Sequence, residues 1–392
     1  MSRFLKMAAA LGHDIDKLER GEEIDQEQTA TSIDNLKEII MADNEPKEPP
    51  TTMDPPNTLI GRAYNYVFYD TELSKDDREK LAPSFPMTIR AISKKVKKLE
   101  KGEVWDIGTS TLQVIVNYDL LVMEAGSSIK ISNTSLTMYI TEVIRNGSPT
   151  NTEGPGYDLG IFGATPVPPS MPPVQGIGKT GDNGPHGTCS AASPGDNGKQ
   201  GKKGWEGEKG TDGTTGGEGM PSLNANIFID EISGEANKFA IFTKSGDGGK
   251  GGPGGKGGPG GWGGKGGDGV CCGCMHTGAG NGGPGGVGGK GGTGGKGGNA
   301  KNGNDIVIAI PRKLRDKIFT NAAEALPGEG GDRGPGGDPG FGGSGGKRAE
   351  NGGCPWGDPG TTGGPGETGP VGELGVKGDD KGKPGTFIFD IK

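Results

Sequence analysis

Glycine recurs at every third position over long stretches of this chain, often as a doublet. Residues 248–267 read GGKGGPGGKGGPGGWGGKGG, and a similar run returns at residues 282–298. Three residues make one turn of the polyproline II helix, which has no internal hydrogen bonds. Its backbone donors and acceptors must therefore bond to neighbouring segments. The period predicts a rod of packed extended segments, and it argues against a conventional enzyme core.

The composition supports this interpretation and excludes several classes of protein. Of 392 residues, 83 are Gly and 29 are Pro, and the apolar share is 29%, whereas a compact domain is nearly half apolar. The formal net charge of −8 argues against a general nucleic-acid binder. No stretch approaches the roughly 20 apolar residues that span a bilayer. The first residues lack the pattern of a secretory signal peptide, so we expect synthesis in the cytoplasm.

Residues 1–147 are expected to form a small α/β base. Residues 1–60 read as two amphipathic helices and a Pro-rich linker, with one apolar stripe from Phe4 to Leu18 and a helix start at Thr31. Residues 61–147 add a helix over residues 85–99 and a β-rich block. Strands are predicted at Thr111–Val116, Leu120–Met123, Ser128–Ile131 and Leu136–Ile144.

Residues 148–392 contain six glycine-periodic segments, and the links between them alternate in kind. Three links are tight and hold every cysteine, at Thr188–Pro194, Val270–Asn281 and Lys347–Trp356. The other links contain predicted strands, at Asn226–Asp230, Lys238–Phe242 and Asp305–Ile310, and a last strand covers Thr386–Ile391. We therefore predict an antiparallel bundle of about six polyproline II helices, with short strands at one end and cysteine loops at the other.

The glycine spacing also predicts which segments are enclosed. Packed three-residue helices approach so closely that a residue facing a neighbour cannot carry a Cβ. A segment with one glycine per triplet has one crowded face, and a segment with doublets has two. The third and fourth segments, around residues 248–298, should therefore be the most enclosed.

The topology predicts that all five cysteines meet at one tip, near His186 and His276. They are Cys189, Cys271, Cys272, Cys274 and Cys354. Three interpretations stay open for them: disulfides, unpaired structural thiols, or a zinc site that uses Cys271, Cys274 and His276. No other cofactor is expected. No catalytic constellation is present, because GxGxxG at residues 176–181 is a by-product of the glycine period.

The glycine runs at residues 248–267 and 282–298 resemble the glycine-rich part of phage tail-fibre adhesins, whose polyproline II helices display receptor-binding loops at a tip. The resemblance implies that the three cysteine loops contact a receptor. The segments with one glycine per triplet are also similar to bacterial collagen-like surface proteins, where three chains form a triple helix. We favour the intramolecular bundle, because strands interrupt the repeat after every pair of segments.

The sequence thus predicts a non-enzymatic structural and adhesive protein on a virion, on a cell surface or outside the cell. Residues 1–147 would attach to a fibre or particle, and the tip would bind a cell-surface receptor or glycan. The candidate contact residues are Cys189, Cys271, Cys272, Cys274, Met275, His276, Cys354 and Trp356. The alternatives are a self-assembling coat or matrix fibre and a thiol-rich metal-binding module, and homo-oligomer formation is left open. Trp205, Trp262 and Trp356 suit either sugar stacking or packing over glycine.

Overall fold

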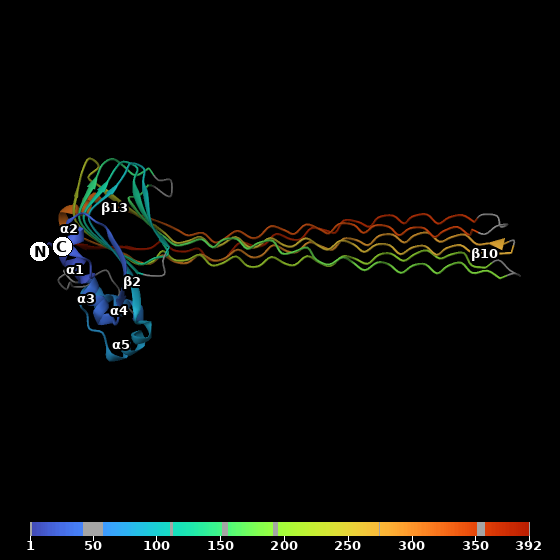
Figure 1. Ribbon diagram of the computed structural model, residues 1–392, viewed down its shortest axis with the longest axis horizontal. Coiled ribbons are helices and arrows are strands. Elements are labelled where there is room, and N and C mark those ends of the chain that lie inside the picture. Colours follow the sequence, from blue (N-terminus) through green and yellow to red (C-terminus); the bar gives the residue numbers. More distant parts are fainter. Residues whose placement is uncertain are drawn as a thin grey trace.

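A strand-rich base carries a long glycine-rich shaft (Figure 1). The computed structural model describes residues 2–41, 58–109, 113–150, 156–190, 195–273, 275–350 and 357–391. The far end of the shaft holds a small hairpin made of β10 (Cys271–Cys272) and β11 (Met275–His276). Both ends of the described chain belong to the base, so every glycine-rich excursion starts and finishes there.

Two β-sheets form the base. Sheet A contains β1 (Ile24–Ala30), β2 (Met87–Leu99), β4 (Gln113–Met123), β6 (Leu136–Arg145), β8 (Ala225–Ser233), β12 (Ile306–Ile310) and β14 (Phe387–Ile391), in that order across the sheet. Sheet B contains β3 (Val104–Thr109), β5 (Ser128–Ser132), β7 (Leu159–Phe162), β9 (Phe239–Lys244) and β13 (Ile318–Ala323). Apart from the antiparallel β1–β2 pair, the strands within both sheets pair in parallel.

The chain builds both sheets together as successive coils. Each of β2, β4, β6, β8 and β12 in sheet A is followed by a strand of sheet B, and the chain then returns to sheet A. Ile306 pairs with Ala225 of the coil before it and with Phe387 of the coil after it, both distant in sequence. In the first coil, Ile89 pairs with Gln113, which follows it much more closely along the chain. The later coils are longer because the glycine-rich segments are inserted in them.

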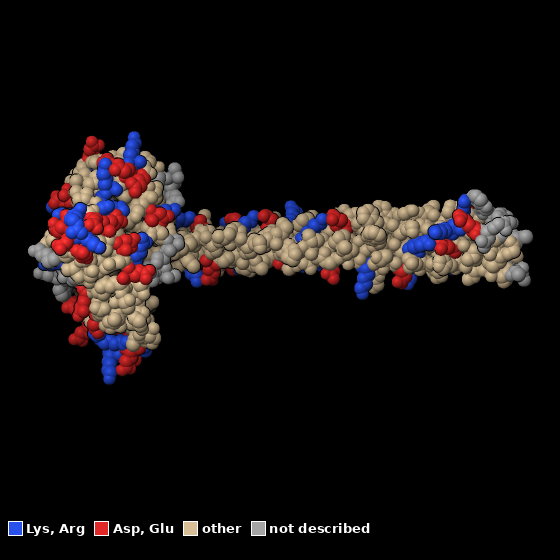
Figure 2. Space-filling view, in the orientation of Figure 1, with Lys and Arg blue, Asp and Glu red and all other residues tan. Residues whose placement is uncertain are grey.

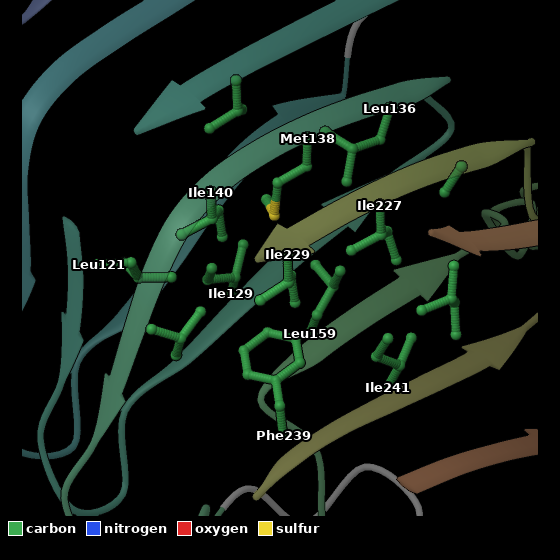
Figure 3. Packing of buried hydrophobic residues seen from close by; sticks show 14 of the residues in the cluster. Leu121, Ile129, Leu136, Met138, Ile140, Leu159, Ile227, Ile229, Phe239 and Ile241 are labelled. Atoms are coloured by element: carbon green, nitrogen blue, oxygen red, sulfur yellow. The ribbon is translucent and has the colours of Figure 1, made fainter. Parts of the chain in front are cut away.

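Apolar side chains from both sheets fill the space between them (Figure 3). The cluster includes Leu121, Met138, Ile140, Ile227 and Ile229 from sheet A, and Ile129, Leu159, Phe239 and Ile241 from sheet B. Each of these is at most 1% exposed. Since successive side chains of a strand point to opposite faces, one face of each strand of the two sheets other than β1 contributes to this core. Full burial of one such side chain stabilises the fold by about 1.5–3 kcal/mol.

Helices cover the outer face of sheet A. They are α1 (Arg3–Ala10), α2 (Ile15–Glu19), α3 (Ile33–Ile40), α4 (Leu59–Tyr69) and α5 (Lys75–Leu81), with 3-10 turns η1 (Ala82–Ser84) and η2 (Arg312–Lys317) elsewhere in the base. Met7, Leu36 and Val67 pack in one buried cluster with Ile115 and Phe228 of the sheet. None of the helices in the described ranges has the length and apolar content to span a bilayer.

The fold class that the sequence predicts is wrong. We expected a small α/β base below an antiparallel bundle of polyproline II helices with short strands at one end. The protein is instead a mixed α/β fold organised by a seven-stranded mixed sheet and a five-stranded parallel sheet. The strands between the glycine runs, such as β8 and β12, are central members of these sheets. The error has a physical cause, because pairing between strands that lie far apart along the chain leaves no local sequence pattern.

The predicted helix over residues 85–99 is also wrong, because β2 covers Met87–Leu99. Its apolar residues have helical spacing, but β2 lies between β1 and β4 and pairs with both of them, so sheet pairing overrides the local pattern. The apolar stripe from Phe4 to Leu18 is divided between α1 and α2, since Gly12 has a φ of +66°. The predicted strands at Leu120–Met123, Ser128–Ile131 and Leu136–Ile144 are confirmed within β4, β5 and β6, while Thr111 lies outside the described residues.

The shaft consists of six extended segments. The first (164–187), third (246–269) and fifth (326–347) run away from the base, and the second (195–221), fourth (278–304) and sixth (357–385) return to it. Backbone hydrogen bonds join the outgoing segments in one row, as when the Gly178 N–H donates to the Pro259 oxygen at 2.9 Å. The returning segments form a second row, in which the Gly204 N–H donates to the Pro284 oxygen at 3.0 Å. Such bonds recur at every third residue along each row.

The strict glycine doublets of the third and fourth segments occur where a segment lies in the middle of its row and contacts two segments of the other row. In the third segment, the Gly257 N–H donates to the Pro335 oxygen of the fifth segment, and the Gly258 N–H donates to the Glu208 oxygen of the second. A Cβ on Gly257 would lie 2.1 Å from the Gly289 oxygen of the fourth segment. The third segment therefore contacts four others, which confirms the expectation that the doublet segments are the most enclosed.

Replacing Gly257 with alanine tests this close approach. The added methyl group would meet the Gly289 carbonyl at 2.1 Å, and two backbones would have to separate. Overpacking of this kind costs about 1–3 kcal/mol. We expect Gly257→Ala to lower the free energy of unfolding by that amount in chemical denaturation. Gly364→Ala is the matched control, because nothing lies within 4 Å of its Cβ position. Equal stability of the two variants would contradict the proposed role of glycine.

A buried ion pair connects the two sheets. Arg145, at the end of β6, is fully buried, and its Nε lies 2.7 Å from Oδ1 of Asp158, which precedes β7. The guanidinium also donates to the carbonyl oxygens of Met123 and Ser127. Burial raises the pKa of Asp158, and the positive charge of Arg145 opposes that rise. Arg145 thus has a counter-ion and two carbonyl acceptors at a position without access to water.

Removing the charge of Asp158 should therefore destabilise the base. Asp158→Asn leaves Arg145 buried without its counter-ion, and loss of one partner of a buried pair costs about 3–5 kcal/mol. Thermal unfolding followed by circular dichroism measures the effect. The control is Asp182→Asn, because the Lys202–Asp182 pair on the shaft is 74% exposed on both sides and should contribute less than about 1 kcal/mol. An equal fall in melting temperature in both variants would refute a special role for the buried ion pair.

Candidate functional site: the tip of the shaft

The tip is the end of the shaft that lies farthest from the base (Figure 1). The outgoing segments end there and the returning segments begin there. Its described residues are 186–190, 195–197, 268–273, 275–279, 347–350 and 357–358. Parts of the chain that are far apart in sequence thus meet in one small region, as the alternation of links predicts.

The β10–β11 hairpin forms the middle of the tip. Cys271 lies opposite His276 and Cys272 lies opposite Met275, in antiparallel register. Gly273 has a φ of +63°, a left-handed conformation that glycine adopts without strain. It therefore suits the turn between the two strands.

Thr277 fixes the hairpin to the shaft. Its Oγ1 accepts a hydrogen bond from the Val270 N–H at 3.1 Å, and its own N–H donates to the Val270 oxygen at 2.9 Å. Its side chain is only 3% exposed, and a Cβ on Gly187 would lie 2.4 Å from its Oγ1. The buried hydroxyl of Thr277 thus fixes the hairpin to the shaft, and it is not among the predicted site residues.

A disulfide joins the first tip loop to this hairpin. Cys189 and Cys272 are 83 residues apart in sequence, and their Cα atoms lie 6.0 Å apart. Cys271 is also disulfide-bonded. A backbone hydrogen bond closes the first loop, because the Thr188 N–H donates to the Asp196 oxygen at 2.9 Å. The disulfide therefore links a closed first loop to the second tip loop.

Asp268 links the outgoing segments just below the hairpin. Its carboxylate accepts a hydrogen bond from the Lys347 N–H at 2.7 Å, and its own N–H donates to Nδ1 of His186 at 3.0 Å. A hydrogen bond from Lys265, followed by the one from Lys347, lowers the pKa of Asp268. The anion therefore persists at neutral pH and holds the ends of the first, third and fifth segments together.

The structure brings together the candidate residues Cys189, Cys271, Cys272, Met275 and His276. The other candidates, Cys274, Cys354 and Trp356, lie outside the described residues. Of the groups brought together, the His276 side chain is exposed, and Cys189, Cys271, Cys272 and Met275 are half-buried. Asp268 and Thr277 are supporting residues that sequence reasoning missed. The only feature of the sequence that could have indicated them is their position where a glycine-periodic segment meets a cysteine-containing link.

The suggested zinc site has a chemical difficulty at Cys271. Zinc binds the thiolate form of cysteine, and the sulfur of Cys271 is held in a disulfide. Within the described ranges, no group of three or more Cys, His, Asp and Glu side chains is arranged to hold a metal ion. The described part of the tip thus offers His276, but no thiolate from Cys271 or Cys272.

A groove in the base is a second candidate site. It has a volume of about 560 Å³ and lies where the shaft joins sheet B, and its lining includes Phe162, Phe242 and Lys244. Lys244 pairs with Asp247 at 2.8 Å, and Glu324, which also lines the groove, pairs with Lys381 at 3.6 Å. Both charged groups thus have partners within the protein, and the lining contains none of the candidate residues that the sequence indicates. The tip is therefore the stronger candidate.

Comparisons of the chain with protein-family models, with curated proteins and with solved structures found no match. Its function is therefore inferred from its own geometry.

Proposed function

We propose that this protein is a non-enzymatic adhesive spacer, which holds a receptor-binding tip at a distance from the particle or fibre that carries it. The observation that supports this most directly is the disulfide between Cys189 and Cys272. A covalent link that unites two loops at the far end of a shaft maintains one defined surface there. Such preorganisation lowers the entropic cost of binding a partner.

The dimensions of the shaft support a spacer. The third segment covers residues 246–269. Since a polyproline II segment rises about 3.1 Å per residue, this segment is roughly 75 Å long. The helices of the base lie at the opposite end from the tip (Figure 1). We therefore propose that residues 1–147 provide the attachment to a fibre or particle, and that the tip contacts a cell-surface receptor or glycan outside the cell or on a virion.

The edges of the shaft favour a discrete spacer over a coat fibre that grows by side-to-side assembly. The edge segments, the first and the sixth, place their periodic glycines toward other segments of the same chain. A Cβ on Gly181 would lie 2.2 Å from the Lys202 oxygen, and one on Gly366 would lie 1.9 Å from the Gly286 oxygen. Their remaining positions carry side chains such as Asp182 and Glu367. These side chains prevent another glycine segment from approaching as closely as those inside the shaft.

The double substitution Met275→Ala and His276→Ala tests the role of the tip. Both residues lie on β11 and neither is buried, so the fold should tolerate the change. We expect at least a tenfold loss of binding when the labelled full chain is titrated on a panel of bacterial and animal cells. The control is the double substitution Lys290→Ala and Glu373→Ala, which removes an exposed ion pair on the shaft. Unchanged binding by the β11 variant, with an unchanged melting temperature, would reject the proposed receptor site.

Removal of the disulfide tests whether the tip must be preorganised. Replacing both Cys189 and Cys272 with serine opens a covalent loop that spans 83 residues, and loss of such a link typically costs about 2–4 kcal/mol. We expect weaker cell binding and faster hydrogen exchange at the Thr188 and Thr277 amides. The Gly257 amide, in the middle of the shaft, should keep its protection. Full binding without the disulfide would show that a rigid tip is not required.

A further inference from the structure

Ion pairs bridge the third and fifth segments at regular steps along one face of the shaft. Lys250 contacts Asp332 at 2.7 Å, and Lys256, six residues further, contacts Asp338 at 2.7 Å. Six residues are two turns of the three-residue repeat, so both lysines lie on the same face of the third segment. Figure 2 shows such charged groups along the shaft, separated by stretches that carry neither sign. If the repeat continued, another charged residue would stand six residues beyond Lys256.

An aromatic pair lies beyond these two ion pairs. Trp262 stands six residues beyond Lys256, where the third segment would place its next lysine, and its ring contacts the ring of Phe341, three residues beyond Asp338 in the fifth segment, edge-to-face with centroids 5.9 Å apart. Trp262 is 58% exposed and Phe341 is 68% exposed. Exposed apolar residues scattered singly are normal on protein surfaces, but these two are in contact. They form an apolar platform on an otherwise polar ladder.

The backbone below the platform is held on several sides. The Gly263 N–H donates to the Phe341 oxygen at 2.8 Å, which joins the segments of the two rings. The Gly261 N–H donates to the Trp205 oxygen of the second segment, and the Gly181 N–H of the first segment donates to the Trp262 oxygen, both at 2.8 Å. The main chain that carries the rings is thus fixed in position. A ligand that stacks on the indole therefore does not have to order the backbone beneath it.

Hydrogen-bonding groups flank the platform along the third segment. The Lys256–Asp338 pair lies on the side toward the base, and the Lys265–Asp268 pair, at 2.8 Å, lies on the side toward the tip. Ile177 of the first segment is 67% exposed and lies next to Pro259, because the Gly178 N–H donates to the Pro259 oxygen at 2.9 Å. A small apolar area with charged donors and acceptors on either side suits a ligand that has an apolar face and polar edges.

We propose that Trp262 and Phe341 form a carbohydrate-binding site on the side of the shaft, separate from the tip. The C–H face of a pyranose ring would stack on the indole, and hydroxyl groups of the neighbouring sugar units would bond to Asp338 and Lys265, each three residues along the chain from one of the two rings. A protein partner fits less well, because a stable interface buries about 800 Å² on each side, and two rings between charged pairs supply only a fraction of that. The site does not depend on the proposed function of the tip.

The test uses the full chain and three soluble probes: hexasaccharides of glucose, of N-acetylglucosamine and of mannose. Trp262→Ala and Phe341→Ala are compared with the native sequence by isothermal titration calorimetry. The matched control is Trp205→Ala, another shaft tryptophan, which is 65% exposed and has no ring contact with another described aromatic residue. We expect at least one probe to bind, with affinity reduced tenfold or more in both platform variants and unchanged in the control.

Several outcomes would overturn the proposal. They are the absence of binding to all three probes, equal affinity of native and Trp262→Ala protein, and an equal loss in Trp205→Ala. A native dimer in sedimentation experiments that becomes monomeric in Trp262→Ala would identify a protein contact instead, and would also refute the carbohydrate site. The β11 double variant should retain sugar binding at the platform. That result separates failure of this site from failure of the tip.

Discussion

The structure depends on backbone hydrogen bonds between segments that have almost no side chains between them. At Gly257 the Gly289 carbonyl oxygen lies 2.1 Å from where a Cβ would be, so the interior of the shaft is made of main chain. Each net hydrogen bond contributes about 0.5–1.5 kcal/mol, whereas ordering one residue costs about 1–2 kcal/mol of conformational entropy. These two contributions nearly cancel, so the packed glycine-rich segments have little net stability by themselves. The shaft needs the apolar core of the base at one end, and it gains from the disulfide at the other.

Base and shaft share one register. Ile306 and Phe387, which pair in sheet A, are separated along the chain by nearly the same interval as Lys256 and Asp338, which pair on the shaft. Each coil therefore lies beside the previous one along its whole length, from the sheets to the far end. This explains why strands that look like minor interruptions in the sequence are central members of the sheets. It also explains how the tip loops of successive coils come within reach of a disulfide.

The sequence predicted the parts of the fold that have local signals, and missed the parts that depend on distant pairing. The period of three located the extended segments, the doublets identified the enclosed ones, and the position of the cysteines placed Cys189 and Cys272 together. The predicted fold class was wrong because β8 and β12 pair with each other across a whole shaft excursion. The helix predicted at residues 85–99 failed because partners on both sides of β2 outweigh the helical spacing of Ile89, Ile92 and Leu99. At the tip, Asp268 and Thr277 carried no motif, since their roles arise only where three segments end side by side.

A shared register also restricts how such a protein can change. Inserting one triplet in the third segment alone would displace every later ion pair and glycine contact with the first, second, fourth and fifth segments, because all four contact it. A change of length is compatible with the packing of the shaft only when outgoing and returning segments of each long coil change together. A substitution at the outward position of a triplet requires no matching change in another segment, because a side chain at that position lies in water. Chemical variation is therefore easiest at the tip and at outward positions such as those of Trp262 and Phe341, where both proposed binding sites lie.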